Sequence, residues 1–245
     1  SRIFVLNGFA GTGKTTLIAA VVAALKELRI KPVLLAPTGR AAKVLARYCG
    51  QQALTIHKRI YRQRTNADYE SKFSLDFNRE QGAVFIVDEA SMLSDSTGDG
   101  ALFGSGSLLE DLVSYVRSGR GCRLILVGDS AQLPPVGCDF SPALDPATVS
   151  RYGEVVYGLM DEVVRQQMQS GILFNATLVR CMLENRIYEI PKFEMDYPDF
   201  ESVEGGDFME KLQDAFDRYG RDEVIVITRS NKRANRYNEG IRRYI

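Results

Sequence analysis

The chain has 245 residues, of which 45% are hydrophobic, and it carries 31 basic and 31 acidic side chains. This length and composition suffice for one large globular domain, or one and a half smaller ones, with a buried core. A net charge of zero neither favours nor excludes nucleic acid as a partner. No apolar stretch reaches the roughly 18 residues that cross a bilayer, and there is no signal-peptide pattern. We therefore expect a cytoplasmic protein without membrane contact.

Metal and disulfide frameworks are not indicated. The four cysteines are widely spaced and form no CxxC pair, and the only histidine, His57, has no cysteine or second histidine near it in the sequence. Charge is unevenly distributed. Residues 28–67 contain nine basic and no acidic side chains, whereas residues 184–214 contain ten acidic side chains against three basic ones. Two solvated faces are the simplest interpretation of such runs.

In chain order, short β-rich runs alternate with helical stretches. Strands are predicted at residues 2–7, 32–36, 83–89 and 123–129, and helices at residues 14–28, 39–49 and 108–117. The strands are apolar without polar alternation, which is typical of strands buried on both faces of a parallel sheet. The pattern predicts an α/β doubly wound fold, a parallel sheet flanked by helices.

Two polar segments interrupt this alternation, at residues 62–81 and 94–107, and we expect both to be surface excursions. Towards the end of the chain we expect a helix to about residue 185, an acidic connection, and then helix, strand and helix at residues 208–220, 223–228 and 231–244. One strand with two helices is too little for a domain, so we expect a truncated second domain.

The stretch "GFAGTGKTT" matches the phosphate-binding pattern GxxxxGK[ST] and lies between a predicted strand and a predicted helix. In such a loop, backbone N–H groups converge on phosphates at a helix N-terminus, the lysine reaches the β- and γ-phosphates, and the hydroxyl after it can ligate Mg²⁺. The predicted nucleotide-binding residues are Gly8, Ala10, Gly11, Thr12, Gly13, Lys14, Thr15 and Thr16.

An acidic pair, Asp88 and Glu89, ends the buried run "AVFIVDE". With the phosphate loop, Asp88 is placed to hold Mg²⁺ together with Thr15, and Glu89 is placed to take a proton from an attacking water. Alternatively, either carboxylate caps the following helix. The stretch "VGDSAQLPPVG" follows in the next buried strand and places Gln132 near the γ-phosphate, where its amide can donate to a phosphate oxygen and accept from a water. The two adjacent prolines stiffen the backbone after it.

With these residues identified, the chain resembles a superfamily 1 DNA helicase of the RecD-like, 5′-to-3′ branch. "GFAGTGKTT" resembles motif I of that family, "APTGRAAKVL" motif Ia, "TIHK" motif Ib, "VDEASM" motif II, "GDSAQLPPVG" motif III and "EVVRQ" motif IV. The resemblance implies a RecA-like P-loop NTPase domain at residues 1–163 and the beginning of a second RecA-like domain at residues 164–245. It also includes motifs before and after these residues, so we expect a fragment that unwinds little on its own.

The resemblance implies ATP and Mg²⁺ as cofactors and single-stranded DNA, or a junction of duplex and single-stranded DNA, as the partner. It assigns catalytic roles to Lys14, Glu89, Gln132 and Arg165, although Arg165 could instead only pair with Asp161 or Glu162. The DNA-facing residues that it implies are Pro37, Thr38, Gly39, Arg40, Thr55, His57 and Lys58. These lie within the acid-free stretch, which favours a phosphate-binding surface there.

The segment at residues 62–82 occupies the position of a small hairpin that in relatives acts as a wedge at the duplex fork. Phe73, Leu75 and Phe77 alternate, as in one strand of a hairpin with an apolar face; that face either stacks on a base pair or packs onto the domain. Two other functions are compatible with the phosphate loop alone: a P-loop kinase, and a binding module that uses nucleotide without hydrolysing it.

Overall fold

The computed structural model describes residues 3–65, 71–95, 103–162, 170–220 and 222–244. The chain divides into two compact units. The first comprises Ser1–Gln169 with Leu173–Pro191, and the second comprises Ser170–Ile172 with Lys192–Ile245.

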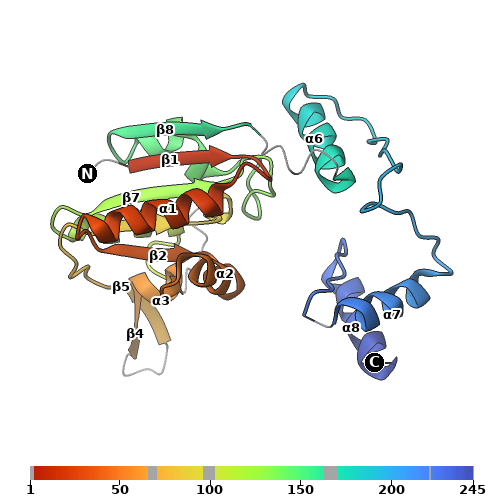
Figure 1. Ribbon diagram of the computed structural model, residues 1–245. Helices are drawn as coiled ribbons and strands as arrows, with labels where there is room; N and C mark the ends of the chain where they lie inside the picture. Colours follow the sequence, from red (N-terminus) through yellow and green to blue (C-terminus); the bar gives the residue numbers. More distant parts are fainter. Residues whose placement is uncertain (1–2, 66–70, 96–102, 163–169, 221, 245) are drawn as a thin grey trace. The chain divides into compact units, whose positions relative to one another are not determined.

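A six-stranded parallel sheet forms the centre of the first unit (Figure 1). Its strands lie in the order β3-β2-β6-β7-β1-β8. They comprise β1 (Ile3–Gly8), β2 (Pro32–Ala36), β3 (Ala53–Thr55), β6 (Val84–Val87), β7 (Arg123–Gly128) and β8 (Val155–Met160). Every neighbouring pair is parallel. The predicted α/β fold is therefore confirmed, with the first strand between β7 and β8.

Helices cover both faces of this sheet. Successive side chains on a strand point to opposite faces, so an apolar strand has hydrophobic side chains to bury on each face. On β2, Leu34 packs in a cluster with Ile18 and Leu45, whereas Leu35 packs in a second cluster on the other face. The first face is covered by α1 (Lys14–Glu27) and α2 (Gly39–Cys49), which Figure 1 shows in front of the sheet. The second face is covered by α3 (Ile56–Ile60), α4 (Leu108–Ser118), α5 (Pro146–Ser150) and the short 3-10 turns η1 (Ala90–Met92) and η2 (Pro142–Leu144).

A two-stranded antiparallel hairpin, β4 (Tyr61–Thr65) and β5 (Ser71–Leu75), projects from the end of α3. Phe73 of this hairpin stacks on Phe103 with 4.5 Å between ring centroids, and Leu75 packs against the main core cluster. The apolar side chains Phe73 and Leu75 thus pack onto the domain, which was one of the two alternatives. Phe77 lies beyond the strand and is 64% exposed.

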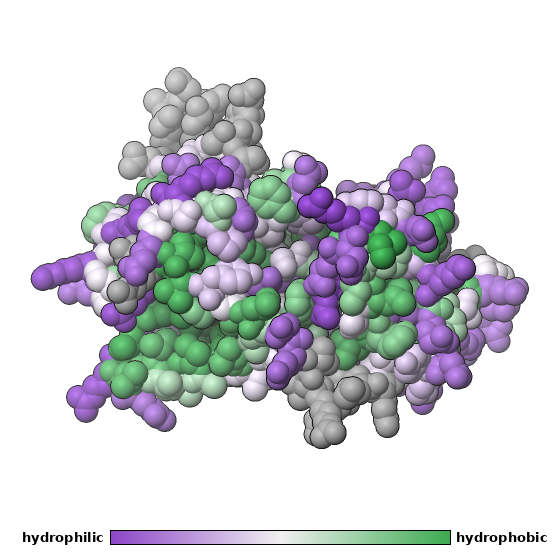
Figure 2. Space-filling model, turned by 90° about the horizontal axis from the view of Figure 1, so that it is seen from above, coloured by the Kyte–Doolittle hydropathy of each residue, from purple (hydrophilic) through white to green (hydrophobic). Residues whose placement is uncertain are grey.

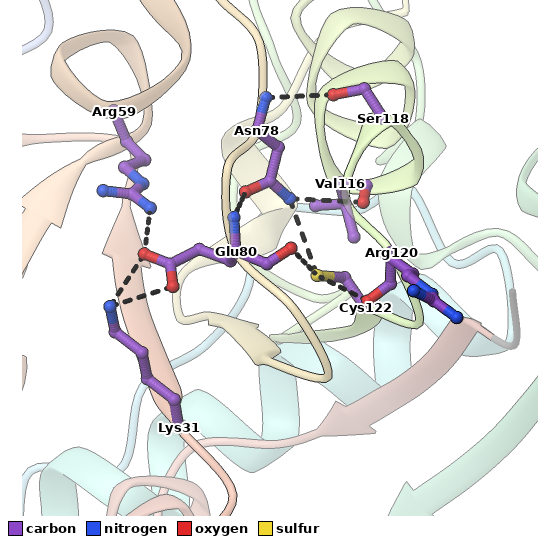
Figure 3. A network of polar contacts seen from close by, with 8 residues as sticks. All are labelled: Lys31, Arg59, Asn78, Glu80, Val116, Ser118, Arg120 and Cys122. Atoms are coloured by element: carbon purple, nitrogen blue, oxygen red, sulfur yellow. Dashed lines mark hydrogen bonds and ion pairs between the residues drawn. The ribbon is translucent and has the colours of Figure 1, made fainter.

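The segment that follows the hairpin is not the surface excursion that its polarity suggests. Asn78 is 1% exposed, its backbone N–H donates to Ser118 Oγ at 3.1 Å, and its Nδ2 donates to the Val116 carbonyl oxygen at 3.3 Å (Figure 3). Two residues further on, Glu80 accepts hydrogen bonds from Lys31 Nζ at 2.8 and 2.9 Å and from Arg59 at 2.7 Å. These contacts fasten the return segment to the C-terminal end of α4 and to α3.

Glu80→Gln should lower the free energy of unfolding by about 1 kcal/mol at pH 7, because Gln cannot balance the two cations. The hydrogen bond from Lys31 and that from Arg59 lower the pKa of Glu80, against the raising effect of burial. A group with a lowered folded-state pKa contributes stability above its unfolded pKa and loses it as the pH falls through the folded value. The difference between the two proteins should therefore shrink below about pH 4, as measured by urea unfolding.

Glu27→Gln is the matched control, since Glu27 is exposed at the end of α1. This substitution should not lower the free energy of unfolding at pH 7 or below about pH 4. Equal stability of the wild-type protein and Glu80→Gln at pH 7 would show that the ion pairs contribute nothing measurable.

β8 is a strand that sequence analysis did not predict. It forms one edge of the sheet, and Val156, Tyr157 and Leu159 are between 41% and 51% exposed. Figure 2, viewed from above in the frame of Figure 1 and so from the β8 side, shows hydrophobic surface gathered over this part of the molecule. Among the described residues, no helix combines the length and the apolar character that a membrane span requires.

The second unit contains α7 (Phe208–Tyr219) and α8 (Asn231–Tyr244), while α6 (Gly171–Glu184) precedes the acidic connection. Phe208 of α7 packs on Tyr237 of α8, with ring centroids 5.4 Å apart. The prediction of a strand at residues 223–228 is wrong, because these residues form no ladder and Ile225 and Ile227 are 64% and 88% exposed. The described residues of this unit contain no second strand with which this apolar run could form a ladder. Strand propensity alone does not stabilise a single strand.

Candidate nucleotide-binding site

The phosphate loop connects β1 to α1, and its backbone explains its glycines. Gly11 and Gly13 have φ angles of 77° and 85°, a left-handed conformation that favours glycine. Gly13 is the N-cap residue of α1 and provides no side-chain cap, so the first-turn N–H groups of the helix remain available to an anion. At Gly8, an added Cβ would lie 2.9 Å from Lys14 Cγ, so the lysine side chain needs the space that glycine leaves.

Lys14 lies over this loop. Its Nζ donates to the carbonyl oxygens of Gly8 at 2.7 Å and Phe9 at 2.9 Å, and it is 3.9 Å from Asp129 Oδ2. The side chain is only 14% exposed. The loop therefore holds a largely buried ammonium group beside the first turn of α1, the arrangement that binds terminal phosphates.

The remaining predicted residues of the loop differ in their environments. Thr12 is 4% exposed, and its hydroxyl donates to the Phe9 carbonyl oxygen at 2.8 Å, so it shapes the loop from within. Thr15 is half-buried at the start of α1, whereas Ala10 and Thr16 are exposed. Thr15 is therefore the hydroxyl of this group with a position suited to a metal ligand.

The acidic pair follows β6. Asp88 Oδ1 accepts a hydrogen bond from the Glu89 N–H at 3.0 Å, and Glu89 has a left-handed backbone with φ 56°. Glu89 is the N-cap residue of η1 but makes no side-chain cap bond. The helix-capping alternative for these carboxylates is therefore wrong.

Both carboxyl groups have raised pKa values. Burial raises the pKa of Asp88, against lowering effects of the Glu89 amide and the Lys14 charge. Burial also raises the pKa of Glu89, the Asp88 charge raises it further, and the Lys14 charge lowers it. These mutual effects show that Lys14, Asp88 and Glu89 share one electrostatic environment at the carboxyl end of the sheet.

These residues also fit Mg²⁺. The hydroxyl of Thr15 and the carboxylate of Asp88 are the hard oxygen ligands that Mg²⁺ prefers, and Mg²⁺ commonly keeps several waters and uses only one or two protein carboxylates beside a phosphate. Among the described residues, no group of three or more His, Cys, Asp or Glu side chains is placed to hold a metal ion.

The loop after β7 is hydrogen-bonded to the end of β1, next to the phosphate loop. Asn7 Nδ2 donates to Ser130 Oγ at 2.8 Å, and the Ser130 N–H donates back to Asn7 Oδ1 at 3.0 Å. Asp129, 3% exposed, accepts from the Ala131 N–H at 2.9 Å, and its backbone carbonyl accepts from the Gln132 N–H at 3.2 Å. These hydrogen bonds hold the loop after β7 next to the strand that leads into the phosphate loop.

Gln132 faces a groove of about 1450 Å³ beside the nucleotide site. The groove walls come from the loop after β7, from His57 and Tyr61, from the turn after η1, and from residues 103–108. Leu133 and Val136, in the loop after β7, are 87% and 101% exposed. Gln132 thus lines the groove while its backbone is bound to Asp129, whose carboxylate is near Lys14.

The predicted DNA-facing residues lie at the same carboxyl edge, because β2 and β3 are neighbours and Ala36 pairs with Thr55. Thr38 and Thr55 are N-cap residues whose hydroxyls accept from the N–H groups of Ala41 and Lys58, both at 3.2 Å. These two hydroxyls stabilise α2 and α3. Pro37 is half-buried beside them, and Gly39, Arg40 and Lys58 are exposed.

His57 is half-buried in the groove wall, with its ring edge-on to Phe103 at 5.0 Å. Burial lowers the pKa of His57, which favours the neutral imidazole. Arg165 lies outside the described residues, so its predicted position is untested.

The basic stretch is partly neutralised by acids from outside it. Lys31 and Arg59 pair with Glu80, and Arg62 pairs with Asp76 at 3.2 Å. Within the described part of the chain, four exposed cations of the stretch have no acidic partner within 4 Å and lie on α2 and α3: Arg40, Lys43, Arg47 and Lys58.

Sequence analysis missed the two residues that join the loops, Asn7 and Ser130. A signal exists for Asn7, since an amide side chain near the end of a fully buried strand requires a hydrogen-bonding partner. Asp129 ends a buried strand in the same way, and the lysine that neutralises it could have been expected from the phosphate-loop pattern.

Residues 1–172 match the family described as AAA domain, and the chain belongs to that family. Its curated relatives include RecD-like proteins, the resemblance that the motifs predicted. It is 35% identical over 138 residues to the "ATP-dependent RecD2 DNA helicase" of Deinococcus radiodurans, which covers 55% of this chain and 16% of the relative. It is 32% identical over 201 residues to the "RecBCD enzyme subunit RecD" of Mycobacterium tuberculosis, covering 66% of this chain and 32% of the relative.

A third relative is the "ATP-dependent DNA helicase dda" of Enterobacteria phage T4, 34% identical over 136 residues, with 54% of this chain and 28% of the relative covered. The chain spans less than a third of the length of each of these three relatives. The matched region contains the phosphate loop, the acidic pair and the loop of Gln132, and the RecA-like fold predicted for it is the one observed.

Proposed function

We propose that this chain is the ATP-hydrolysing part of a DNA helicase that moves along single-stranded DNA in the 5′-to-3′ direction. The names of two of the three relatives, those of Deinococcus radiodurans and phage T4, support a helicase. The observation that carries the proposal is the position of Gln132: its loop is hydrogen-bonded to β1 beside Lys14, and its side chain lines the adjacent groove. A P-loop kinase or a passive binding module has no need of such a connection.

In this proposal, the first-turn N–H groups of α1 and Lys14 hold the β- and γ-phosphates of ATP, and Thr15 and Asp88 hold Mg²⁺. The metal, when bound, neutralises charge on the phosphates during transfer to water. Glu89 orients the attacking water and takes its proton, for which a raised pKa makes its carboxylate a stronger base. Gln132 contacts the γ-phosphate, and Arg165 is assigned to the same phosphate by the motif resemblance.

DNA is proposed to lie along the edge formed by α2, α3 and the groove. Arg40, Lys43 and Arg47 lie three and four residues apart on α2 and are exposed, so they form one basic face with Lys58 nearby on α3. His57 contributes a neutral ring to the groove wall, which suits contact with a base. The hairpin β4–β5 is proposed to separate strands at a duplex junction.

The test is ATP turnover by the full-length protein with and without single-stranded DNA. We expect stimulation by DNA and release of free phosphate. Absence of stimulation together with transfer of phosphate to an acceptor molecule would replace the helicase with a kinase. Duplexes with either a 5′ or a 3′ single-stranded tail test the direction, and unwinding of only the 3′-tailed substrate would reverse the proposed polarity.

Gln132→Ala should leave the affinity for ATP within about twofold of the wild-type value, while the stimulation of turnover by DNA should fall by about tenfold. In the proposal, the amide contacts the γ-phosphate but contributes little to ATP affinity. Fluorescent nucleotide titration and turnover with DNA measure the two effects separately. Gln81→Ala, at an exposed glutamine away from the loop, is the control and should change neither. Equal loss of binding and turnover in Gln132→Ala would indicate a role in shaping the site instead.

A further inference from the structure

A buried carboxylate lies beneath the hairpin and has no role in the nucleotide site. Asp111, on α4, is 5% exposed. Its Oδ2 accepts a hydrogen bond from the Tyr61 hydroxyl at 2.7 Å, and its two oxygens accept from the Ser105 N–H at 3.0 and 3.3 Å. Tyr61 is the first residue of β4, so this carboxylate connects α4 to the base of the hairpin and to the segment at residues 103–107.

The same carboxylate fixes the segment at residues 103–107 closely. Gly104 has φ 48°, and an added Cβ there would lie 1.9 Å from Asp111 Oδ2 and 2.7 Å from Tyr61 Cε1. The Gly104 N–H donates to the carbonyl oxygen of Phe73 in β5 at 2.8 Å. Both strands of the hairpin are thereby joined to one short segment, β4 through Asp111 and β5 through Gly104.

This joint also builds one wall of the groove. Phe103 stacks on Phe73 of β5, with ring centroids 4.5 Å apart, and meets His57 at 5.0 Å and Tyr61 at 5.3 Å. Phe103, His57 and Tyr61 all line the groove that Gln132 faces. The aromatic wall therefore runs from the hairpin to the groove without interruption.

Burial, the hydrogen bond to Asp111 and the Asp111 charge all raise the pKa of Tyr61, so its hydroxyl remains a donor throughout the physiological range. A hydrogen bond from a neutral donor to a buried carboxylate is strong, because the charge has few other partners at this depth. The bond thus holds Tyr61 in one position.

We propose that Tyr61 and Asp111 are positioning residues that lock the hairpin to the groove wall, so that the hairpin keeps one orientation during strand separation. Neither side chain is expected to touch ATP. The part of this role that concerns unwinding rests on the proposed helicase function, whereas the locking of the hairpin does not.

Tyr61→Phe in the full-length protein separates these two parts, since it removes only the hydroxyl and keeps the ring in the groove wall. Amide hydrogen exchange of β4, β5 and Gly104 should become about fivefold faster, the change expected for loss of about 1 kcal/mol of local stability. ATP turnover without DNA should stay unchanged. The number of base pairs separated per ATP hydrolysed should fall by about twofold or more.

Tyr152→Phe is the matched control, because the Tyr152 hydroxyl donates to the carboxylate of Asp95 at the same 2.7 Å, and Asp95 also accepts from Ser107 Oγ at 3.1 Å. This variant therefore loosens a contact of the segment at residues 103–107 without removing the bond between Tyr61 and Asp111. It should leave exchange in the hairpin and the base pairs separated per ATP as in the wild-type protein. Unchanged exchange in Tyr61→Phe overturns the locking of the hairpin, whether or not the protein unwinds DNA.

The unwinding role is decided separately. If the wild-type protein unwinds DNA, and exchange in Tyr61→Phe rises while base pairs per ATP stay constant, the lock does not serve strand separation. If ATP turnover falls in parallel with unwinding, the bond only stabilises the domain and the positioning role is overturned. If DNA does not stimulate ATP turnover of the wild-type protein, the proposed helicase function is contradicted instead. In that case hydrogen exchange in Tyr61→Phe alone tests whether the bond locks the hairpin.

Discussion

Lys14→Ala should reduce ATP turnover by roughly a hundredfold to a thousandfold, because it removes an ammonium group held over the phosphate loop. In the structure, this group is bound to the carbonyl oxygens of Gly8 and Phe9 and lies 3.9 Å from Asp129. A charge that the protein holds in place before the substrate arrives stabilises developing phosphate charge without reorganisation. Steady-state phosphate release and nucleotide titration measure the effect, and ATP binding should weaken as well.

Lys26→Ala provides the control on the same helix, since Lys26 is exposed in the last turn of α1. Its turnover should stay within about twofold of the wild-type value. Substantial turnover in Lys14→Ala would mean that phosphate is bound elsewhere, and the assignment of residues 8–16 as the nucleotide loop would have to be abandoned.

Glu89→Gln should lower the rate of ATP cleavage by about a hundredfold to ten-thousandfold while ATP and Mg²⁺ still bind, because the amide has almost the same shape but cannot accept a proton. Loss of the charge also removes repulsion with Asp88, whose charge raises the pKa of Glu89. Binding should therefore be unchanged or tighter. Single-turnover cleavage separates the chemical step from binding and release.

Glu110→Gln, at an exposed glutamate on α4, should cleave ATP at the wild-type rate. If Glu89→Gln cleaved ATP normally, another group would have to be the base. A large loss of nucleotide binding in Glu89→Gln would instead indicate that this carboxylate helps to hold the metal.

The sheet could be predicted from the sequence wherever strands are apolar on both faces. β1, β2, β6 and β7 are central strands of this kind, and of the helices that cover them α2 and α4 have clear amphipathic spacing. β8 was missed because it is an edge strand containing Gly158, a residue that disfavours strands. A Cβ at Gly158 would lie 3.2 Å from Leu6 Cδ1 and Phe4 Cζ, so neighbouring side chains explain this glycine. These neighbours come together only in the assembled sheet, so the sequence alone does not explain the glycine.

The opposite error occurred at residues 223–228. "EVIVIT" has strong strand propensity, but propensity describes how well side chains fit a sheet that already exists. Within the described residues of the second unit there is no neighbouring strand to pair with it. The run is apolar as the prediction assumed, but the partner strand that the prediction needed is not present among these residues.

The candidate nucleotide site could be assembled from the sequence because its predicted residues lie in short contiguous motifs at the ends of predicted parallel strands, which must meet at one edge of the sheet. The contacts beneath the hairpin could not be predicted in this way. Tyr61, Asp111 and Gly104 belong to no motif, and they are up to 50 positions apart, so only the folded chain brings them together. Contacts of this kind need tertiary structure for their detection.

The backbone of Glu89 has a consequence for laboratory evolution. A left-handed conformation at a residue other than glycine costs of order 1 kcal/mol, and burial of the carboxylate adds to that cost. Glycine or asparagine at this position would relieve both. Selection of variants for thermal resistance alone should therefore enrich substitutions at position 89 that abolish the proposed hydrolysis, so laboratory evolution for stability must select for turnover at the same time.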